Sequence, residues 1–160
     1  MKTIAILLIT LLINSCHKDE DEVPISPIND NYVRAKIDNV SYEAIGEALH
    51  GSLDENGFDL DSRNASGTGM DFYIIGPINV GTYTFSASNG TTQGRLNYRI
   101  NGENYSSGFC SASNGTLTIT AKNGKTIEGT FSFNPSSMSE PCLNPKMITV
   151  TEGSFKITVL

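Results

Sequence analysis

The sequence predicts an all-β domain, folded as an antiparallel β-sandwich or partly open barrel of about ten short strands. Three observations support this. Apolar and polar residues alternate in several short runs, as in strands with one buried face. Asn-Gly, a strong hairpin signal, occurs five times. Turn signals recur at intervals of about 8–12 residues, the spacing of sandwiches and barrels.

The alternating runs predict which side chains enter the core. The expected inward positions are Val33, Ala35 and Ile37; Leu96, Tyr98 and Ile100; Leu117 and Ile119; Ile127, Gly129, Phe131 and Phe133; and Phe155, Ile157 and Val159. The segment 43–49 is ambiguous, because it could also form one or two helical turns that Gly46 would weaken.

Four hairpin turns are expected between these runs. They are Asp38-Asn39 between Val33–Ile37 and Val40–Ala44, Asn101-Gly102 between Arg95–Ile100 and Glu103–Phe109, Asn123-Gly124 between Thr116–Lys122 and Lys125–Phe133, and Glu152-Gly153 between Met147–Thr151 and Ser154–Val159. Each pairs small or polar residues that tolerate the backbone of a tight turn.

The chain begins with a predicted secretory signal at residues 1–15. Lys2 supplies a positive charge, and Ile4–Ile13 is a run of ten residues that is apolar apart from Thr10. Ten helical residues rise about 15 Å, half the thickness of a bilayer core, so the run is too short to span a membrane as a helix.

The end of this signal resembles the lipobox of bacterial lipoproteins. Ile13-Asn14-Ser15-Cys16 has an aliphatic residue, a variable one, a small one and then cysteine. The resemblance implies cleavage before Cys16 and lipidation of Cys16. Several acyl chains together give stable membrane residence.

Residues 16–30 are predicted to form an acidic, proline-containing tether, followed by a single domain at 31–160. Four consecutive acids at 19–22 favour a solvated segment. Lys18-Asp19-Glu20 also resembles the surface-export signal of lipoproteins from the Bacteroidota. That resemblance implies an outer-membrane location facing the cell exterior, with the periplasmic face as the alternative.

The mature chain resembles a family of small Bacteroidota lipoproteins of unknown function. The resemblance is carried by Val33–Asp38 followed by Tyr42, by Gly81-Thr82-Tyr83, by Gly115–Thr120, and by the closing pair Ile127–Phe133 and Ile148–Phe155. These patterns are mostly those of β-hairpins. Because the family has no assigned activity, the resemblance implies location and fold and no catalytic residue.

Two cysteines remain once Cys16 is assigned to lipid. An even pair in an exported chain favours a disulfide between Cys110 and Cys142. Two free thiols or a nucleophilic cysteine are the alternatives. A nucleophile needs a base, and the only histidines are His17 in the tether and His50.

One oxygen-rich cluster could hold a metal. Asp54 and Asn56 lie in an expected turn, and Asp59 and Asp61 share a face of the next strand, as oxygen ligands for calcium would. The spacing does not match an EF-hand, and the ordinary alternative is a hairpin turn followed by a strand with a wet face. His50 has no partner at zinc spacing. We therefore expect no metal and no cofactor.

A set of aromatic and cationic residues could form a binding face for sugars or peptides. Its candidates are Tyr73, Tyr83, Tyr98, Tyr105, Arg95 and Arg99; alternatively, these tyrosines rim the core with wet hydroxyls. The net charge of −6 and the absence of a basic patch argue against nucleic-acid binding.

The sequence thus favours a non-enzymatic, monomeric, lipid-anchored module that binds a glycan or an envelope protein or serves a structural role. An accessory hydrolase or inhibitor module is the alternative. An enzyme should show a cleft with clustered acids or histidine of perturbed pKa, and a binder an exposed aromatic or apolar patch.

Overall fold

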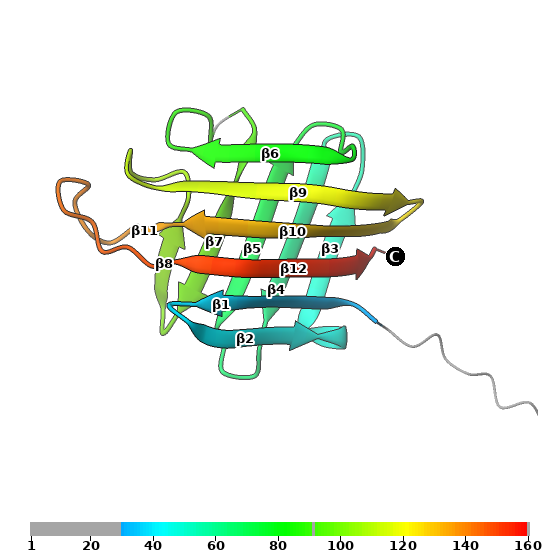
Figure 1. Cartoon of the computed structure of the whole chain (residues 1–160), viewed down its shortest axis with the longest axis horizontal. Helices are drawn as coiled ribbons and strands as arrows, with labels where there is room; N and C mark the ends of the chain where they lie inside the picture. Colours follow the sequence, from blue (N-terminus) through cyan, green and yellow to red (C-terminus); the bar gives the residue numbers. More distant parts are fainter. Residues whose placement is uncertain (1–29, 91, 160) are drawn as a thin grey trace, which may run out of the picture.

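The structure is a computed structural model that describes residues 30–90 and 92–159. These residues form two antiparallel six-stranded sheets, stacked face to face (Figure 1). The predicted all-β sandwich is therefore confirmed. The predicted signal at 1–15, Cys16 and the tether up to residue 29 lie outside the described residues.

The front sheet has the strand order β2-β1-β12-β10-β9-β6. Its strands are β1 (Tyr32–Ile37), β2 (Val40–Ile45), β6 (Gly81–Ser86), β9 (Asn114–Asn123), β10 (Thr126–Asn134) and β12 (Val150–Thr158). The first and last long strands pair directly, Val33 opposite Phe155. The first and last strands of the domain are thereby held side by side in one sheet.

The back sheet has the order β11-β8-β7-β5-β4-β3. Its strands are β3 (Leu49–Leu53), β4 (Gly57–Arg63), β5 (Gly69–Ile75), β7 (Gly94–Ile100), β8 (Glu103–Ser106) and β11 (Ser136–Ser137). In Figure 1 its strands cross those of the front sheet steeply. The two sheets are separate and do not close into a barrel.

The core fills the space between the sheets, and the predicted alternation is confirmed. Every predicted inward position is buried or half-buried. Phenylalanines from both sheets meet at the centre: the ring centroids of Phe72 on β5 and Phe131 on β10 are 4.6 Å apart. Phe155 on β12 lies 5.8 Å from Phe72.

Three of the four predicted hairpins are confirmed. Asp38 and Asn39 have φ of 47° and 68°, and Asn101 and Gly102 have φ of 51° and 81°. Positive φ at both central residues is the geometry that matches the twist of a hairpin. The third hairpin is present but one residue later than predicted: Asn123 ends β9, and Gly124 and Lys125 join it to β10, with Gly124 at φ 57°.

The predicted turn at Glu152-Gly153 is wrong. Both residues lie inside β12, where Glu152 has φ of 52° and the register with both neighbouring strands shifts. The pair forms a bulge, because a residue at positive φ can extend one strand locally without reversing it. A Cβ atom at Gly153 would lie 2.4 Å from the carbonyl oxygen of Phe131, which explains the glycine.

The ambiguous segment contributes one short helical turn. Gly46–Ala48 forms a 3₁₀ turn between β2 and β3 and carries the chain from the front sheet to the back sheet. Twelve strands are described, where about ten were expected. The twelve include β11, which is only two residues long. No helix among the described residues is long and apolar enough to cross a membrane.

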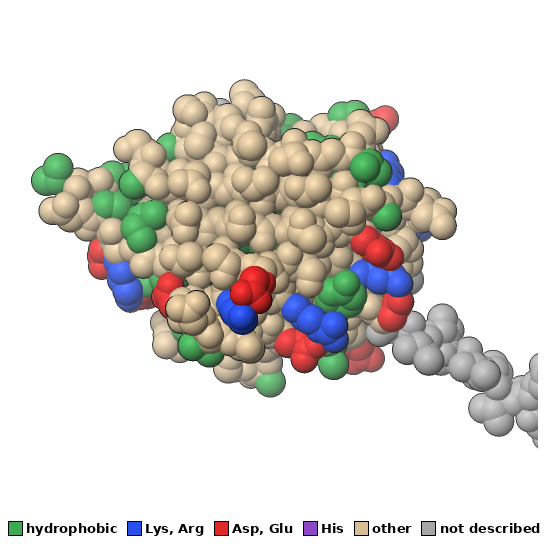
Figure 2. Space-filling model, in the orientation of Figure 1, with side chains coloured by type: hydrophobic (Ala, Val, Ile, Leu, Met, Phe, Trp, Pro, Cys, Tyr) green, Lys and Arg blue, Asp and Glu red, His purple; other side chains and the backbone are tan. Residues whose placement is uncertain are grey.

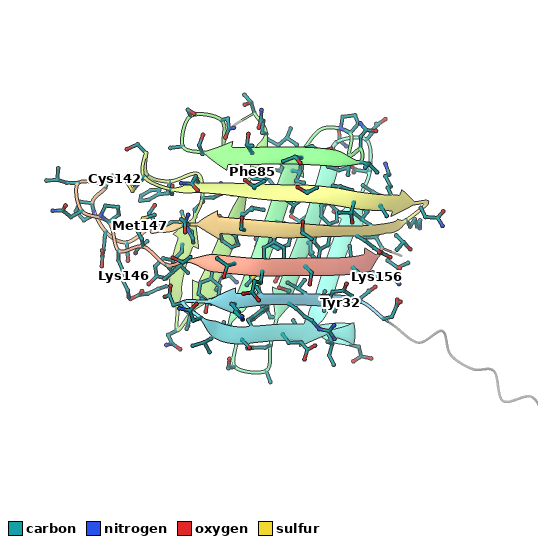
Figure 3. All side chains as sticks on the ribbon, in the orientation of Figure 1. Tyr32, Phe85, Cys142, Lys146, Met147 and Lys156 are labelled. Carbon is teal, nitrogen blue, oxygen red and sulfur yellow. A yellow bond between two sulfur atoms is a disulfide. The ribbon has the colours of Figure 1, made fainter. Side chains whose placement is uncertain are left out.

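Cys110 and Cys142 form a disulfide, the pairing that the sequence favours. It fastens the loop 138–147, which extends beyond the sandwich at the end carrying Cys142, Lys146 and Met147 (Figure 3). The backbone of this loop is also held by its own acid, since the amide of Lys146 donates to Glu140 Oε2 at 2.8 Å.

Candidate functional site

The outer surface of the back sheet is charged, and we call it the back face. It comprises the outward side chains of β4, β5 and β7, namely Asp59, Asp61, Arg63, Asp71, Tyr73, Arg95, Asn97 and Arg99. Because alternate residues of a strand point to one side, these polar positions alternate with core residues such as Leu60, Phe72 and Leu96.

The strand register determines which of these side chains are neighbours. Asp61 lies opposite Asp71, and Asp71 lies opposite Asn97 on the next strand. Tyr73 lies opposite Arg95. Side chains directly opposite on one sheet face have Cβ atoms about 4.5–5.5 Å apart, so they can act on the same ligand.

A hollow of about 250 Å³ lies on this face. Asp61, Asp71, Asn97 and both arginines of β7 line it, together with Asn104 of β8. Met138, from the loop that the disulfide fastens, lies beside it: the Met138 amide donates to the carbonyl of Asn104 at 2.8 Å.

The acids of the hollow are unusual. Burial raises the pKa of Asp71 above its ordinary value, and the neighbouring Asp61 raises it further, while Arg95 and Arg99 act in the opposite direction. Asp59, elsewhere on the back face, also has a raised pKa. Burial is the main cause, and the charges of Asp71 and Asp61 raise it further. Burial and the neighbouring carboxylate therefore outweigh the opposing effect of the two arginines on Asp71.

One acceptor in the hollow has no partner. The Asn97 side chain forms a hydrogen bond with the Asp71 carboxylate, which an amide can do only as donor. Its Oδ1 atom is buried and has no hydrogen-bond partner, the single case of this kind among the described residues. A buried unsatisfied acceptor costs about 1–3 kcal/mol, so this side chain is kept at a cost to stability.

The cations of the hollow have unused donors. Arg99 donates from Nε to Asn104 Oδ1 at 2.9 Å, which leaves its two terminal nitrogens available. Arg95 is exposed and forms no hydrogen bond or ion pair within the described part of the chain. By contrast, Arg63 forms a two-pronged pair with Asp61, with Nη2 to Oδ2 at 2.8 Å.

The predicted aromatic and cationic face is divided by the fold. Tyr73, Arg95 and Arg99 share the back face as predicted. Tyr98 and Tyr105 do not belong to it, because both are buried between the sheets, 3% and 1% exposed. Tyr98 occupies an inward position of its own alternating run, and that burial outweighs its polar hydroxyl.

Tyr83 lies on the other sheet. It is on β6 of the front sheet, half-buried, and its hydroxyl is hydrogen-bonded to the backbone of Asn79, 3.0 Å from the carbonyl oxygen. It is therefore a structural residue of the β5–β6 connection and contributes nothing to the back face.

The predicted calcium cluster is also divided. Asp54 accepts hydrogen bonds from the amides of Asn56 and Gly57 at 2.7 and 3.1 Å, so its carboxylate stabilises the turn. Asp59 and Asp61 instead point outward from β4. Within residues 30–90 and 92–159 there is no group of three or more His, Cys, Asp or Glu side chains that could hold a metal ion.

Sequence reasoning missed Asp71, Asn97, Asn104 and Met138. Asp71 and Asn97 could have been predicted from the sequence, since Asp71 precedes Tyr73 by two residues and Asn97 lies between the two arginines of β7. Their shared face follows from the alternation already used for the core. Asn104 and Met138 depend on β8 and β11 pairing, which no local pattern predicts.

Comparison of the sequence with known protein families assigns the domain to one of them. A family model described as a domain of unknown function, DUF6252, matches residues 29–157. The chain belongs to this family. No curated protein and no solved structure matches it.

Proposed function

We propose that the chain is an outer-membrane lipoprotein, anchored through Cys16 and facing the cell exterior, whose sandwich binds a glycan without cleaving it. The observation that supports the binding function is the hollow on the back face. It combines the available donors of Arg95 and Arg99 with the half-buried carboxylate of Asp71. The lipobox and the acidic tether support the location.

A sugar residue fits this combination of side chains. Its hydroxyls donate and accept at once, so a complementary site needs both donors and acceptors within a small space. Arg95 and Arg99 supply donors, and the Asp71 carboxylate supplies acceptors. Tyr73, 39% exposed, lies next to the hollow and offers a ring face to the apolar side of a sugar.

The binding experiment is a titration of the detergent-solubilised full chain with a panel of monosaccharides, followed by NMR shifts of its amides. We expect glucose, galactose, mannose or N-acetylglucosamine to shift amides of β5, β7 and β8. Arg99→Gln should weaken that binding about tenfold or more, since a hydrogen bond from a charged group is worth about 1.5–3 kcal/mol.

Arg34→Gln is the matched control. Arg34 is an exposed arginine on the outer surface of the front sheet, paired with Glu43, whereas Arg99 is half-buried. It should bind the same sugar as the unaltered chain. Shifts confined to the front sheet, or equal losses in both variants, would contradict binding in the hollow.

The anchor is tested separately. Cys16→Ser should release the chain from the membrane fraction of its native cells, because no thiol remains there for lipid. Protease treatment of intact cells should remove the domain if it faces outward. A membrane-bound chain after Cys16→Ser would refute the anchor, and full protection would place the domain in the periplasm.

A hydrolase remains the second candidate, because one observation favours it. Asp61 and Asp71 lie directly opposite each other in the hollow, and the pKa of Asp71 is raised by burial. Glycosidases use two facing carboxyl groups, one of them protonated. Release of nitrophenol from nitrophenyl glycosides, abolished by Asp71→Asn, would replace the binding proposal with this one.

A further inference from the structure

A second hollow lies at one open end of the sandwich, between the sheets, and we call it the mouth. Its walls are mainly apolar, formed by Ile37, Val40, Tyr42, Tyr98, Ile100 and Ile148. The turns Asp38-Asn39 and Asn101-Gly102 lie at its edge, one from each sheet. Its volume of about 550 Å³ is within the range of small-molecule sites.

The apolar wall of the mouth reaches the surface. Val40, the first residue of β2, is 69% exposed and pairs with the half-buried Ile37. Ile100 lies across the opening at the end of β7, also half-buried. Isolated exposed valines are ordinary, but one that continues into a concave apolar wall indicates a place for an apolar ligand.

The rim holds one cation, and that cation is paired within the molecule, while Asp38 keeps its negative charge. Lys146 Nζ lies 3.0 Å from Glu103 Oε2, and the same oxygen accepts the hydroxyl of Tyr105 at 2.5 Å. Asp38 Oδ1 accepts the amide of Thr149 at 2.8 Å. A ligand therefore meets no unpaired cation here, in contrast to the back face with its free arginine.

One phenol in the wall is available to a ligand. Tyr42 is bonded to Ser62, and Tyr105 is bonded to Glu103. Tyr98 forms no hydrogen bond with any residue in the described ranges, and burial raises its pKa to about 12. Its hydroxyl therefore stays protonated in neutral solution and can both donate and accept.

We infer that the mouth binds a neutral, amphipathic small molecule, with its apolar body against Val40 and Ile100 and one polar atom at the Tyr98 hydroxyl. This site shares only Tyr98 with the lining of the hollow on the back face, and it goes beyond the proposed function. The rim has no unpaired cation and one unpaired carboxylate, Asp38, so it disfavours anionic ligands. The three aromatic rings favour a planar apolar body.

The test uses N-phenyl-1-naphthylamine, a neutral fluorophore with one N–H group, titrated into the full chain. We expect saturable fluorescence enhancement, at least tenfold weaker binding in Val40→Asp, and unchanged binding in Val80→Asp. Val80 is the matched control, an exposed valine at 63% that lies in the β5–β6 connection and does not line the mouth. Both sites are exposed, so both variants should fold.

Three further measurements make the result specific. Tyr98→Phe, which keeps the ring, should weaken binding several-fold, and the anionic dye 8-anilinonaphthalene-1-sulfonate should bind more weakly than the neutral one. Arg99→Gln should leave binding of the neutral dye unchanged, which separates this site from the hollow. Absent saturation, equal losses in Val40→Asp and Val80→Asp, or tighter binding of the anionic dye would overturn the inference.

Discussion

The two outer faces of the sandwich are built by the same alternation and differ in how their charges are arranged. On the front sheet, opposite charges face each other across strands: Arg34 lies opposite Glu43, with Nε 2.6 Å from Oε1. On the back sheet, like charges face each other, Asp61 opposite Asp71. Opposite charges across a strand pair are stabilising and like charges destabilising.

Most of the front face is uncharged. Figure 2 shows its charged side chains gathered over β1, β2 and β12, while the surface over β6, β9 and β10 is mainly neutral. Hydroxyls bond to one another there, as with Thr82 and Thr118 at 3.0 Å. Such pairs satisfy hydroxyls of the front face, whereas on the back face Arg95 has no ion pair and Asn97 Oδ1 has no hydrogen-bond partner among the described residues.

The two faces therefore differ in what their polar groups contribute to stability, and this difference agrees with the binding function that we propose for the back face. A sheet face can be made stable with paired charges and hydroxyls, as the front sheet demonstrates. The back face keeps half-buried carboxylates side by side at a cost. Groups of perturbed pKa cluster at functional sites for this reason.

The largest effect should come from the disulfide beside the back face. Replacing both Cys110 and Cys142 by serine opens a loop whose cysteines are 32 residues apart. The chain-entropy model gives a loss of roughly 3–4 kcal/mol in the free energy of unfolding. Urea denaturation measures it, and hydrogen exchange should show lost protection in β8 and β11 but not in β9 and β10. Uniform loss across both sheets would contradict a local role.

The bulge of the front sheet should give the next largest effect. Gly153→Ala places a Cβ 2.4 Å from the Phe131 carbonyl oxygen, a backbone atom that cannot move aside without disturbing β10. We expect a loss of about 1–3 kcal/mol by urea denaturation, typical of overpacking. Ser154→Ala, the next residue and half-buried, is the control and should cost less. Equal effects would remove the steric explanation.

Relieving the like-charge contact of the back face should stabilise the protein. Asp71→Asn should raise the free energy of unfolding at pH 7 by up to about 1 kcal/mol, the scale of a cross-strand charge pair. Because folding raises the pKa of Asp71 above 3.8, its cost is absent well below pH 3.8 and grows as pH rises through the folded pKa. The gain should therefore vanish near pH 3.

Asp54→Asn should change the free energy of unfolding in the opposite direction. Hydrogen bonds from Asn56 and Gly57 lower the pKa of Asp54 below 3.8, so its stabilisation is present above pH 3.8 and lost as pH falls through the folded pKa. This variant should therefore be less stable than the unaltered chain at pH 7. If both variants changed the free energy of unfolding in the same direction, the opposite contributions that we assign to Asp71 and Asp54 would be wrong.

The fold was largely predictable because short segments of the sequence determine most of its strands and turns. Alternation determines which face of each strand is buried, and the turns at Asp38-Asn39 and Asn101-Gly102 need backbone that few residues adopt. The failure at Glu152-Gly153 has the same origin. A residue pair that tolerates positive φ serves a bulge as well as a turn, and only pairing on both sides of β12 distinguishes them.

The site was predictable only in part, because it depends on which strands are neighbours. Tyr73, Arg95 and Arg99 were correct as outward residues, but Tyr98 and Tyr105 were grouped with them by type, although alternation already placed Tyr98 in the core. Asn104 reaches the hollow through the β7–β8 pairing, and Met138 lies beside it through its own contact with Asn104. Contacts between distant segments are not encoded in any window of the sequence.

The smallest effect compares one arginine from each face. Arg34→Gln removes an exposed pair with Glu43 and should cost about 0.3 kcal/mol at low salt, the usual scale of a surface salt bridge. The cost should disappear in 1 M salt, where charges are screened beyond about 3 Å. Arg95→Gln breaks no ion pair, so its effect on stability should be smaller still, while sugar binding is lost. If Arg95→Gln proved the more destabilising of the two, Arg95 would be a structural partner of Asp71 and the back face would lose its free donor.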